Sequence, residues 1–213
     1  MGRVGQARDK ILIAARTLIA QRGYTALGVA EICAAAGVPK GSFYHFFQSK
    51  QALALTVIDE HWTAQRAQWT ELLGGDGPPL RRLRDLFEAT ETVQRSGQQD
   101  NGAVVGCLFG NLALELSSQD GDIQGRLQQI FNEQIDLIEQ VVTEARDRGD
   151  TAAAVDVRDA ARSIVAQLEG RVLFAKLLND PGQLEAMWRN CLALLGVTDP
   201  GRTREVLAGA RPE

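Results

Sequence analysis

One short segment near the start of the chain gathers side chains that can donate hydrogen bonds to an anion. They are Lys40, Ser42, Tyr44, His45 and Lys50. On a helix, Lys40 and Tyr44 fall on one face and could bind phosphates, whereas Ser42 and His45 could reach base edges. We rank the phosphate contacts above the base contacts. The segment therefore predicts a surface that binds double-stranded DNA.

The aromatic residues of the same segment allow a second interpretation. Phe43, Phe46 and Phe47 are expected to form an aromatic core. Tyr44 and His45 could then be no more than the solvated rim of that core. The basic residues around them favour contact with DNA instead.

Charge is unevenly divided along the chain. The whole chain carries −4, but residues 1–50 hold seven Lys or Arg against Asp9 and Glu31. That segment therefore carries +5 and the remainder −9. A basic module joined to an acidic one fits a protein whose N-terminal end faces phosphates.

Residues for other kinds of chemistry are sparse. His45 and His61 are the two histidines, and neither belongs to a catalytic triad or a metal-ligand pattern. Cys33, Cys107 and Cys191 are too scattered for a disulfide framework, so we expect free thiols. We expect neither catalysis nor a metal or cofactor.

Three helices must position the donor segment. Apolar periodicity predicts helices over 9–22 and 28–35, and Pro39 is expected in the first turn of a third helix over 40–46. Gly37 lets the chain turn sharply between the last two, and a following valine can plug the space between them. Residues 28–47 thus form a predicted helix-turn-helix.

The rest of the chain also shows helical periodicity. Ser49 is the expected N-cap of a long helix over 50–73, which can link two modules. Further helices are expected over 80–94, 107–117, 123–148, 157–178 and 183–195.

We therefore predict an all-α fold of about nine helices. A DNA-binding domain is expected over 6–52, a larger domain over 53–197, and a frayed tail over 200–213. No apolar run is long enough to span a membrane, so we expect no membrane partner and a cytoplasmic protein.

Several stretches of the N-terminal segment match a known family. They are Gly23-Tyr24, residues 29–33, the run AGVPKGSFYHFF over 36–47, and Ser49-Lys50. This pattern closely resembles the TetR (tetracycline-repressor) family, in which Gly41 would join the DNA-binding residues. Gly28 departs from it, standing where many members carry a Thr or Ser. The resemblance implies a homodimer on a palindromic operator, released when a small-molecule inducer enters the larger domain.

Two later stretches resemble branches of that family that respond to electrophiles or oxidants, the N-ethylmaleimide reductase repressor and an acryloyl-CoA-responsive repressor. The first of these two stretches contains Gly106-Cys107-Leu108, and the second contains Ala175-Lys176. The resemblance implies that Cys107 is a sensor thiol and Lys176 its cationic neighbour. A thiol at a helix start or near a lysine is more reactive because its pKa falls. An inert buried cysteine is the alternative.

A noncovalent ligand would need a pocket in the larger domain. Trp62, Trp69 and Phe87 could line one or belong to the core. Polar residues that could orient the ligand, or be satisfied by neighbouring helices, are Asn111, Glu115, Glu169 and Arg171.

The last two predicted helices carry apolar residues that, by the resemblance, would form a dimer interface. They include Ile164, Leu168, Leu184, Trp188, Leu192 and Leu195. An enzyme is rejected for lack of a catalytic arrangement. Two alternatives stay open: a DNA-binding protein without a ligand, and a repressor of an apolar or acyl-CoA ligand in which Cys107 is a bystander.

Overall fold

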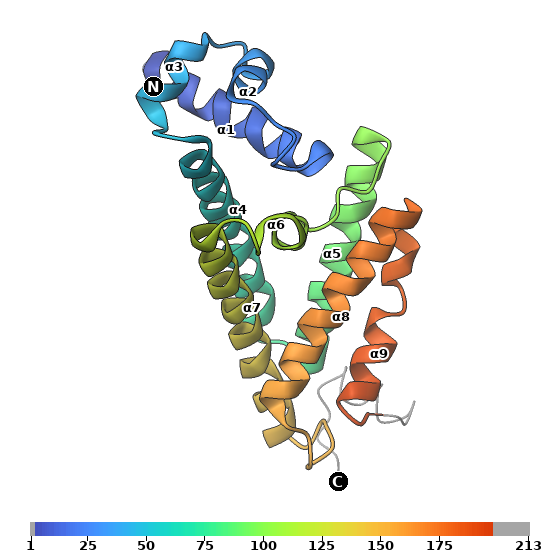
Figure 1. Ribbon diagram of the computed structural model, residues 1–213. Helices are drawn as coiled ribbons and strands as arrows, with labels where there is room; N and C mark the ends of the chain where they lie inside the picture. The colour runs from blue at the N-terminus through green and yellow to red at the C-terminus, as the bar shows by residue number, and fades with distance from the viewer. Residues whose placement is uncertain (1–2, 198–213) are drawn as a thin grey trace. The chain divides into compact units, whose positions relative to one another are not determined.

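The computed structural model describes residues 3–197, and their side chains from Gln6 on. The elements in this range are α1 (Arg3–Arg22), α2 (Val29–Ala36), α3 (Lys40–Phe46), α4 (Lys50–Leu73), α5 (Pro79–Asn101), α6 (Leu108–Leu116), α7 (Gly121–Asp147), α8 (Val157–Leu178), the 3-10 helix η1 (Pro181–Leu184) and α9 (Met187–Leu194) (Figure 1). Nine α-helices without a strand in the described residues confirm the predicted all-α fold.

The chain forms two compact units. One contains the described residues up to Ala64 together with Cys107–Gln129, and the other contains Gln65–Gly106 and the described residues from Ile130 on. Both α4 and α7 therefore have residues in each unit. The domain limits of 6–52 and 53–197 stay a prediction, because a compact unit is not the same thing as a functional domain.

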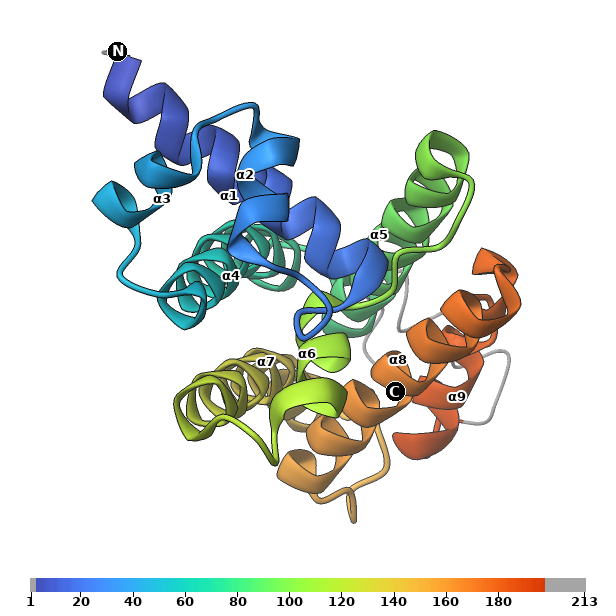
Figure 2. The same ribbon diagram turned by 45° about the horizontal axis from the view of Figure 1, so that its top comes forward.

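The first unit is built around the helices α1, α2 and α3, which lie close together in Figure 2. Their apolar faces supply a shared core in which Ile11, Ile32 and Phe43 are almost completely buried. Leu53 and Ile58 from the first half of α4 are buried as well. Burial of large apolar side chains on every helix is what holds these short elements together.

In the second unit, α8 packs against η1 and α9, and α5 contacts all three. The residues predicted as a dimer stripe belong to this packing instead: Ile164, Leu168, Leu184, Leu192 and Leu195 are buried. These five side chains therefore do not form an exposed stripe, whereas Trp188 is half-buried. A dimer interface on the last two helices stays a prediction. The exposed apolar side chains of α8 are Leu173, Phe174, Leu177 and Leu178.

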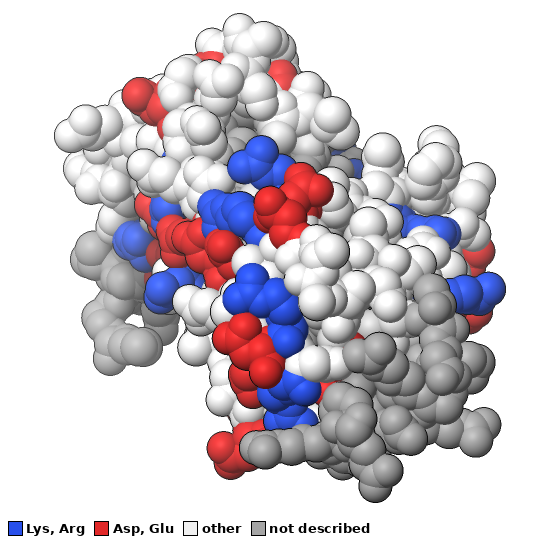
Figure 3. Space-filling model, turned by 90° about the horizontal axis from the view of Figure 1, so that it is seen from below, with Lys and Arg blue, Asp and Glu red and all other residues white. Residues whose placement is uncertain are grey.

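Charged side chains of both signs cover the surface in small groups. On the face shown in Figure 3, basic and acidic residues lie next to each other. Arg158 illustrates this arrangement, because its guanidinium pairs with Asp136 and lies 2.6 Å from Glu139. Exposed pairs of this kind contribute little stability, so the fold depends mainly on its apolar core.

Several helix starts differ from the predictions. α1 begins at Arg3 rather than residue 9, and α7 begins at Gly121 rather than residue 123. Pro39 is the N-cap of α3, with φ −61° and ψ 142°, rather than a residue of its first turn. The helix expected over 183–195 is divided into η1 and α9. Asp180 is the N-cap of η1, and its carboxylate accepts the N–H of Gly182 at 2.9 Å.

Two further observations concern the expected membrane and tail properties. Within residues 3–197, the helices are too short or too polar to cross a membrane. The tail expected over 200–213 lies outside the described residues.

Candidate nucleic-acid interface

The turn between α2 and α3 has the geometry that a helix-turn-helix requires. Gly37 adopts φ 64° and ψ 35°, a left-handed conformation that glycine accepts without strain. Its N–H donates to Ala34 O at 3.1 Å, and the Val38 N–H donates to Cys33 O at 3.0 Å. These two hydrogen bonds form a Schellman motif that ends α2. The predicted glycine turn is confirmed.

Helix α3 has one buried face and one exposed face. Phe43 is fully buried and packs against Phe47, with ring centroids 5.6 Å apart. Lys40 and His45 are exposed, and Tyr44 exposes 57% of its surface. The predicted donors on this face, with the exposed backbone of Gly41, are therefore accessible. Ser42, by contrast, is half-buried. Contact of all these residues with DNA stays a prediction.

Lys50 has contacts that sequence reasoning did not foresee. Its ammonium donates to Tyr24 O at 3.2 Å and to Leu27 O at 2.9 Å, and it lies 4.1 Å from the centroid of the Tyr24 ring. Lys50 thus holds the loop between α1 and α2. Its role as a DNA contact is still a prediction, to which the structure adds this second role.

Glu115, near the end of α6, contacts the same loop. Its carboxylate accepts the N–H of Tyr24 at 2.8 Å and that of Thr25 at 2.5 Å. Burial pushes the pKa of Glu115 upward, but the hydrogen bonds from Thr25 and Tyr24 and the charge of Lys50 outweigh it, so the pKa is lowered. The side chain is therefore held as a carboxylate. Sequence reasoning had placed Glu115 at a ligand, and that role stays untested.

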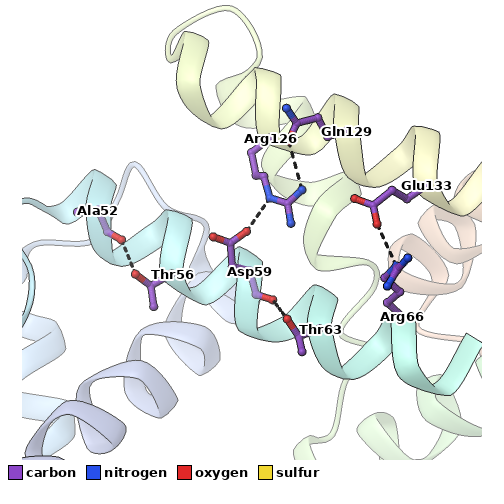
Figure 4. A network of polar contacts seen from close by, with 8 residues as sticks. All are labelled: Ala52, Thr56, Asp59, Thr63, Arg66, Arg126, Gln129 and Glu133. Carbon is purple, nitrogen blue, oxygen red and sulfur yellow. Dashed lines mark hydrogen bonds and ion pairs between the residues drawn. The ribbon is translucent and has the colours of Figure 1, made fainter.

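Helix α4 is tied to α7 within the first unit. The Gln51 side chain donates to Asp120, which also caps α7 by accepting the Ile123 N–H at 3.1 Å. Further along α4, Asp59 pairs with Arg126 at 2.6 Å (Figure 4). The hydrogen bonds to Asp120, from Ile123 above all, lower the pKa of its carboxyl despite partial burial. Within the first unit, the first part of α4 is therefore joined to the first part of α7.

Cys107 is the N-cap of α6. It is half-buried, and its Sγ accepts the N–H of Gly110 at 3.4 Å. This confirms the predicted position at a helix start. Cys33 and Cys191 are buried, and burial raises the pKa of both thiols, that of Cys191 to about 12.

The remaining predicted ligand residues lie in both units. Asn111, half-buried, is on α6 with Cys107, whereas buried Trp69 is on α4 and half-buried Lys176 on α8, both in the second unit. The second unit contains a cavity of about 170 Å³. Its lining includes Thr70, Arg82 and Glu144 but not Trp69, Asn111 or Lys176. Their ligand roles stay predictions.

Known proteins resemble the chain along most of its length. Residues 79–191 match the family model described as tetracyclin repressor-like, C-terminal domain, and residues 11–57 match that of bacterial regulatory proteins, tetR family. The transcriptional regulator AcuR of Cereibacter sphaeroides is 32% identical over 184 residues, 86% of this chain and 82% of the relative. The transcriptional repressor NemR of Escherichia coli is 31% identical over 141 residues, 66% of this chain and 69% of the relative. The crystal structure of its reduced form superposes with a TM-score of 0.79 at 27% identity, covering 90% of this chain and 98% of that one.

Proposed function

This chain belongs to the TetR family of bacterial regulatory proteins and is a DNA-binding transcriptional regulator, and we propose that it is a repressor which a small molecule releases from its operator. The observation that carries the proposal is the exposed face of α3, where Lys40, Tyr44 and His45 point away from a core anchored by Phe43. A helix of this kind can enter the major groove while α2 crosses the backbone.

The first test is binding to the DNA upstream of the protein's own gene, measured by fluorescence anisotropy over a range of salt concentrations. Lys40→Ala should weaken binding and lower the slope of log K against log salt by about 1, because one phosphate contact is lost. Arg162→Ala is the matched control, since Arg162 is an exposed cation on α8. If Lys40→Ala kept the salt dependence of the wild type, Lys40 on α3 would not contact a DNA phosphate.

A homodimer is part of the proposed function. An operator that is a palindrome needs two reading heads about 34 to 36 Å apart or a multiple of that distance. On α8, Phe174 and Leu177 lie on an exposed apolar face together with Leu173 and Leu178. This patch, rather than the buried stripe expected from the sequence, is the surface we propose for a second copy of the chain.

For the release step, we propose that an electrophile or oxidant acts on Cys107. The thiol lies at the start of α6 and is half-buried, whereas Cys33 and Cys191 are buried. With an activated alkene, the thiolate sulfur would form an S–C bond to one alkene carbon while the π bond of the C=C group breaks. The proton lost by the thiol would then add to the other alkene carbon. A bulkier sulfur could then displace α6. Lys176 enters this proposal only through the family resemblance.

Operator binding with and without N-ethylmaleimide, at fixed salt, tests this step. Release of the wild type but not of Cys107→Ser supports the sensor thiol, and Cys191→Ser is the matched control because its sulfur is buried. Equal release of the wild type and Cys107→Ser would contradict it.

A noncovalent inducer, apolar or an acyl-CoA, is the second candidate. Asn111 is half-buried on α6 and could orient such a ligand. Trp69, which is buried on α4, is a separate candidate for packing against an apolar ligand. Release of Cys107→Ser by a ligand that does not react with thiols would favour this candidate. A protein that responds to neither kind of molecule would be a ligand-independent DNA-binding regulator.

A further inference from the structure

The loop that joins α1 to α2 is held on its backbone by two side chains of opposite charge. Glu115 binds its N–H groups and Lys50 its carbonyl groups. We propose that Glu115 positions the DNA-reading helices, by fixing this loop to the helix α6 that begins at Cys107. The inference rests on the DNA-binding function proposed above and assigns Glu115 a role in that function.

Both carboxylate oxygens of Glu115 take part in the contact. One oxygen accepts from Tyr24 at 2.8 Å and the other from Thr25 at 2.5 Å, so the carboxylate spans two consecutive peptide groups. Hydrogen bonds to a charged acceptor are stronger than those between neutral groups. Two such bonds to neighbouring N–H groups fix the orientation of the loop as well as its distance from α6.

Gly23 leaves room for this carboxylate. A Cβ at this position would lie 3.0 Å from one Glu115 oxygen and 3.2 Å from the other, closer than nearly all real contacts. Gly23 also has φ 78°, a conformation that other residues adopt only with strain. The end of α1 is thus shaped to receive Glu115.

Lys50 completes the arrangement from the start of α4. Its ammonium binds the carbonyls of Tyr24 and Leu27, so the loop is held through both kinds of backbone group. The loop leads directly into α2, and the Gly37 turn leads from α2 into α3. Fixing the loop therefore fixes the path of the chain into the DNA-reading helix.

Helix α6 carries this contact to Cys107. Eight residues separate Cys107 from Glu115, which corresponds to about 12 Å along a helix. A helix moves as a stiff element, so a displacement at its N-cap would shift the carboxylate at its other end. The loop contact is thus the point where a change in α6 would reach the reading head.

The test compares binding to the operator with binding to a DNA duplex of unrelated sequence. Glu115→Ala should weaken operator binding about tenfold, because both hydrogen bonds are lost, and Glu115→Gln should fall between it and the wild type, because the amide keeps one acceptor oxygen. Binding to unrelated DNA should stay the same or tighten slightly, since a negative charge has been removed. Glu88→Gln, which removes an exposed acid from α5, is the charge-matched control and should change neither.

This pattern separates a positioning role from the alternatives. A purely electrostatic effect would tighten binding to both duplexes, and a general loss of stability would weaken both and lower the melting temperature. Either result, or unchanged operator binding in Glu115→Ala, would overturn the proposal. A wild type that does not distinguish the two duplexes would instead count against the proposed function.

Amide hydrogen exchange tests the contact without DNA. In Glu115→Ala, the N–H groups of Tyr24 and Thr25 should exchange faster, while that of Ile32 in the core of α2 should keep its rate. Unchanged exchange at Tyr24 and Thr25 would overturn the proposal even if operator binding were lost. Gly23→Ala, which crowds the carboxylate while keeping its charge, should show the same faster exchange.

Discussion

Among single residues, the three cysteines differ in what their surroundings allow. Burial raises the pKa of Cys33 and Cys191, so their thiols stay protonated and unreactive. Cys107 is half-buried and receives an N–H from the first turn of α6. All three cysteines lie on or beside a helix, but only the sulfur of Cys107 is accessible, whereas those of Cys33 and Cys191 are enclosed.

We expect N-ethylmaleimide to alkylate the folded protein mainly at Cys107. Mass spectrometry of the native protein should show one fast adduct on the peptide that contains Cys107, because that sulfur is accessible and the other two are buried. In strong denaturant all three cysteines should react, which is the internal control. Fast labelling of Cys191 in the native protein would show that its enclosure is not stable.

His61 should make the protein less stable toward mildly acidic pH. Burial chiefly, and then the charge of Arg16, lower the pKa of His61 below its usual value of 6.5. The unfolded chain therefore takes up a proton at a higher pH than the folded protein does. Stability is complete above the ordinary histidine pKa and falls as the pH drops below it.

Urea unfolding at pH 7.5 and pH 5.5 measures this effect. We expect a lower midpoint at pH 5.5 in the wild type and a smaller difference in His61→Gln. The lowered pKa values of Glu115 and Asp120 act in a separate, more acidic range, because their contribution is lost only below the usual carboxyl pKa. An unchanged pH dependence in His61→Gln would contradict the assignment.

Contacts between single residues were the part of the site that the sequence could not supply. Lys40, Tyr44 and His45 could be placed on an exposed face, because helical spacing and an aromatic core settle which side faces water. Glu115 and Lys50 could not be placed, since they meet a loop far from them in sequence. No periodicity or capping rule connects a carboxylate on α6 to the Tyr24 N–H.

At the scale of elements, helix ends were predictable where a local stop signal stands in the sequence. α3, α4 and α8 have the bounds that were predicted. Ser49 precedes α4 as expected, and Asp156 and Asn179 flank α8. α5 continues to Asn101, beyond the predicted end at residue 94, because the polar stretch that suggested a break keeps helical hydrogen bonds up to the turn at Gly102.

Gly37 and Gly41 should respond to alanine in opposite directions. A Cβ at either position would meet nothing within 4 Å, so only the backbone differs. Gly37→Ala should lower the free energy of unfolding by about 1 kcal/mol because of its positive φ, whereas Gly41→Ala, inside α3, should raise it by about 0.5 to 1 kcal/mol. Chemical denaturation measures both.

Operator binding by Gly41→Ala tests whether Gly41 lies at the DNA interface. If the backbone of Gly41 approaches DNA closely, Gly41→Ala should bind the operator more weakly although it folds more stably. A variant that is more stable and binds as well as the wild type would remove Gly41 from the interface.

For the molecule as a whole, the division of charge has consequences for its interactions. The first 50 residues carry a net charge of +5 and the remainder −9. Electrostatic attraction to DNA therefore acts on the N-terminal helices and not on the rest of the chain. The acidic remainder opposes non-specific binding along the duplex. We therefore expect affinity for the operator to depend mainly on the contacts of the N-terminal helices.

Disrupting the exposed face of α8 should separate a dimer into monomers. Phe174 is 52% exposed and Leu177 72% exposed, so glutamate at both positions can be solvated in the monomer but would be costly to bury against a second copy. In analytical ultracentrifugation the wild type should sediment at twice the chain mass of 23.2 kDa and the double variant at once that mass. Operator binding by the variant should weaken strongly, because the two heads would no longer be linked.

Val93→Glu on α5, also at an exposed apolar residue, should stay dimeric. A wild type that sediments as a monomer, or a double variant that remains a dimer with its helical content intact, would move the interface away from this face.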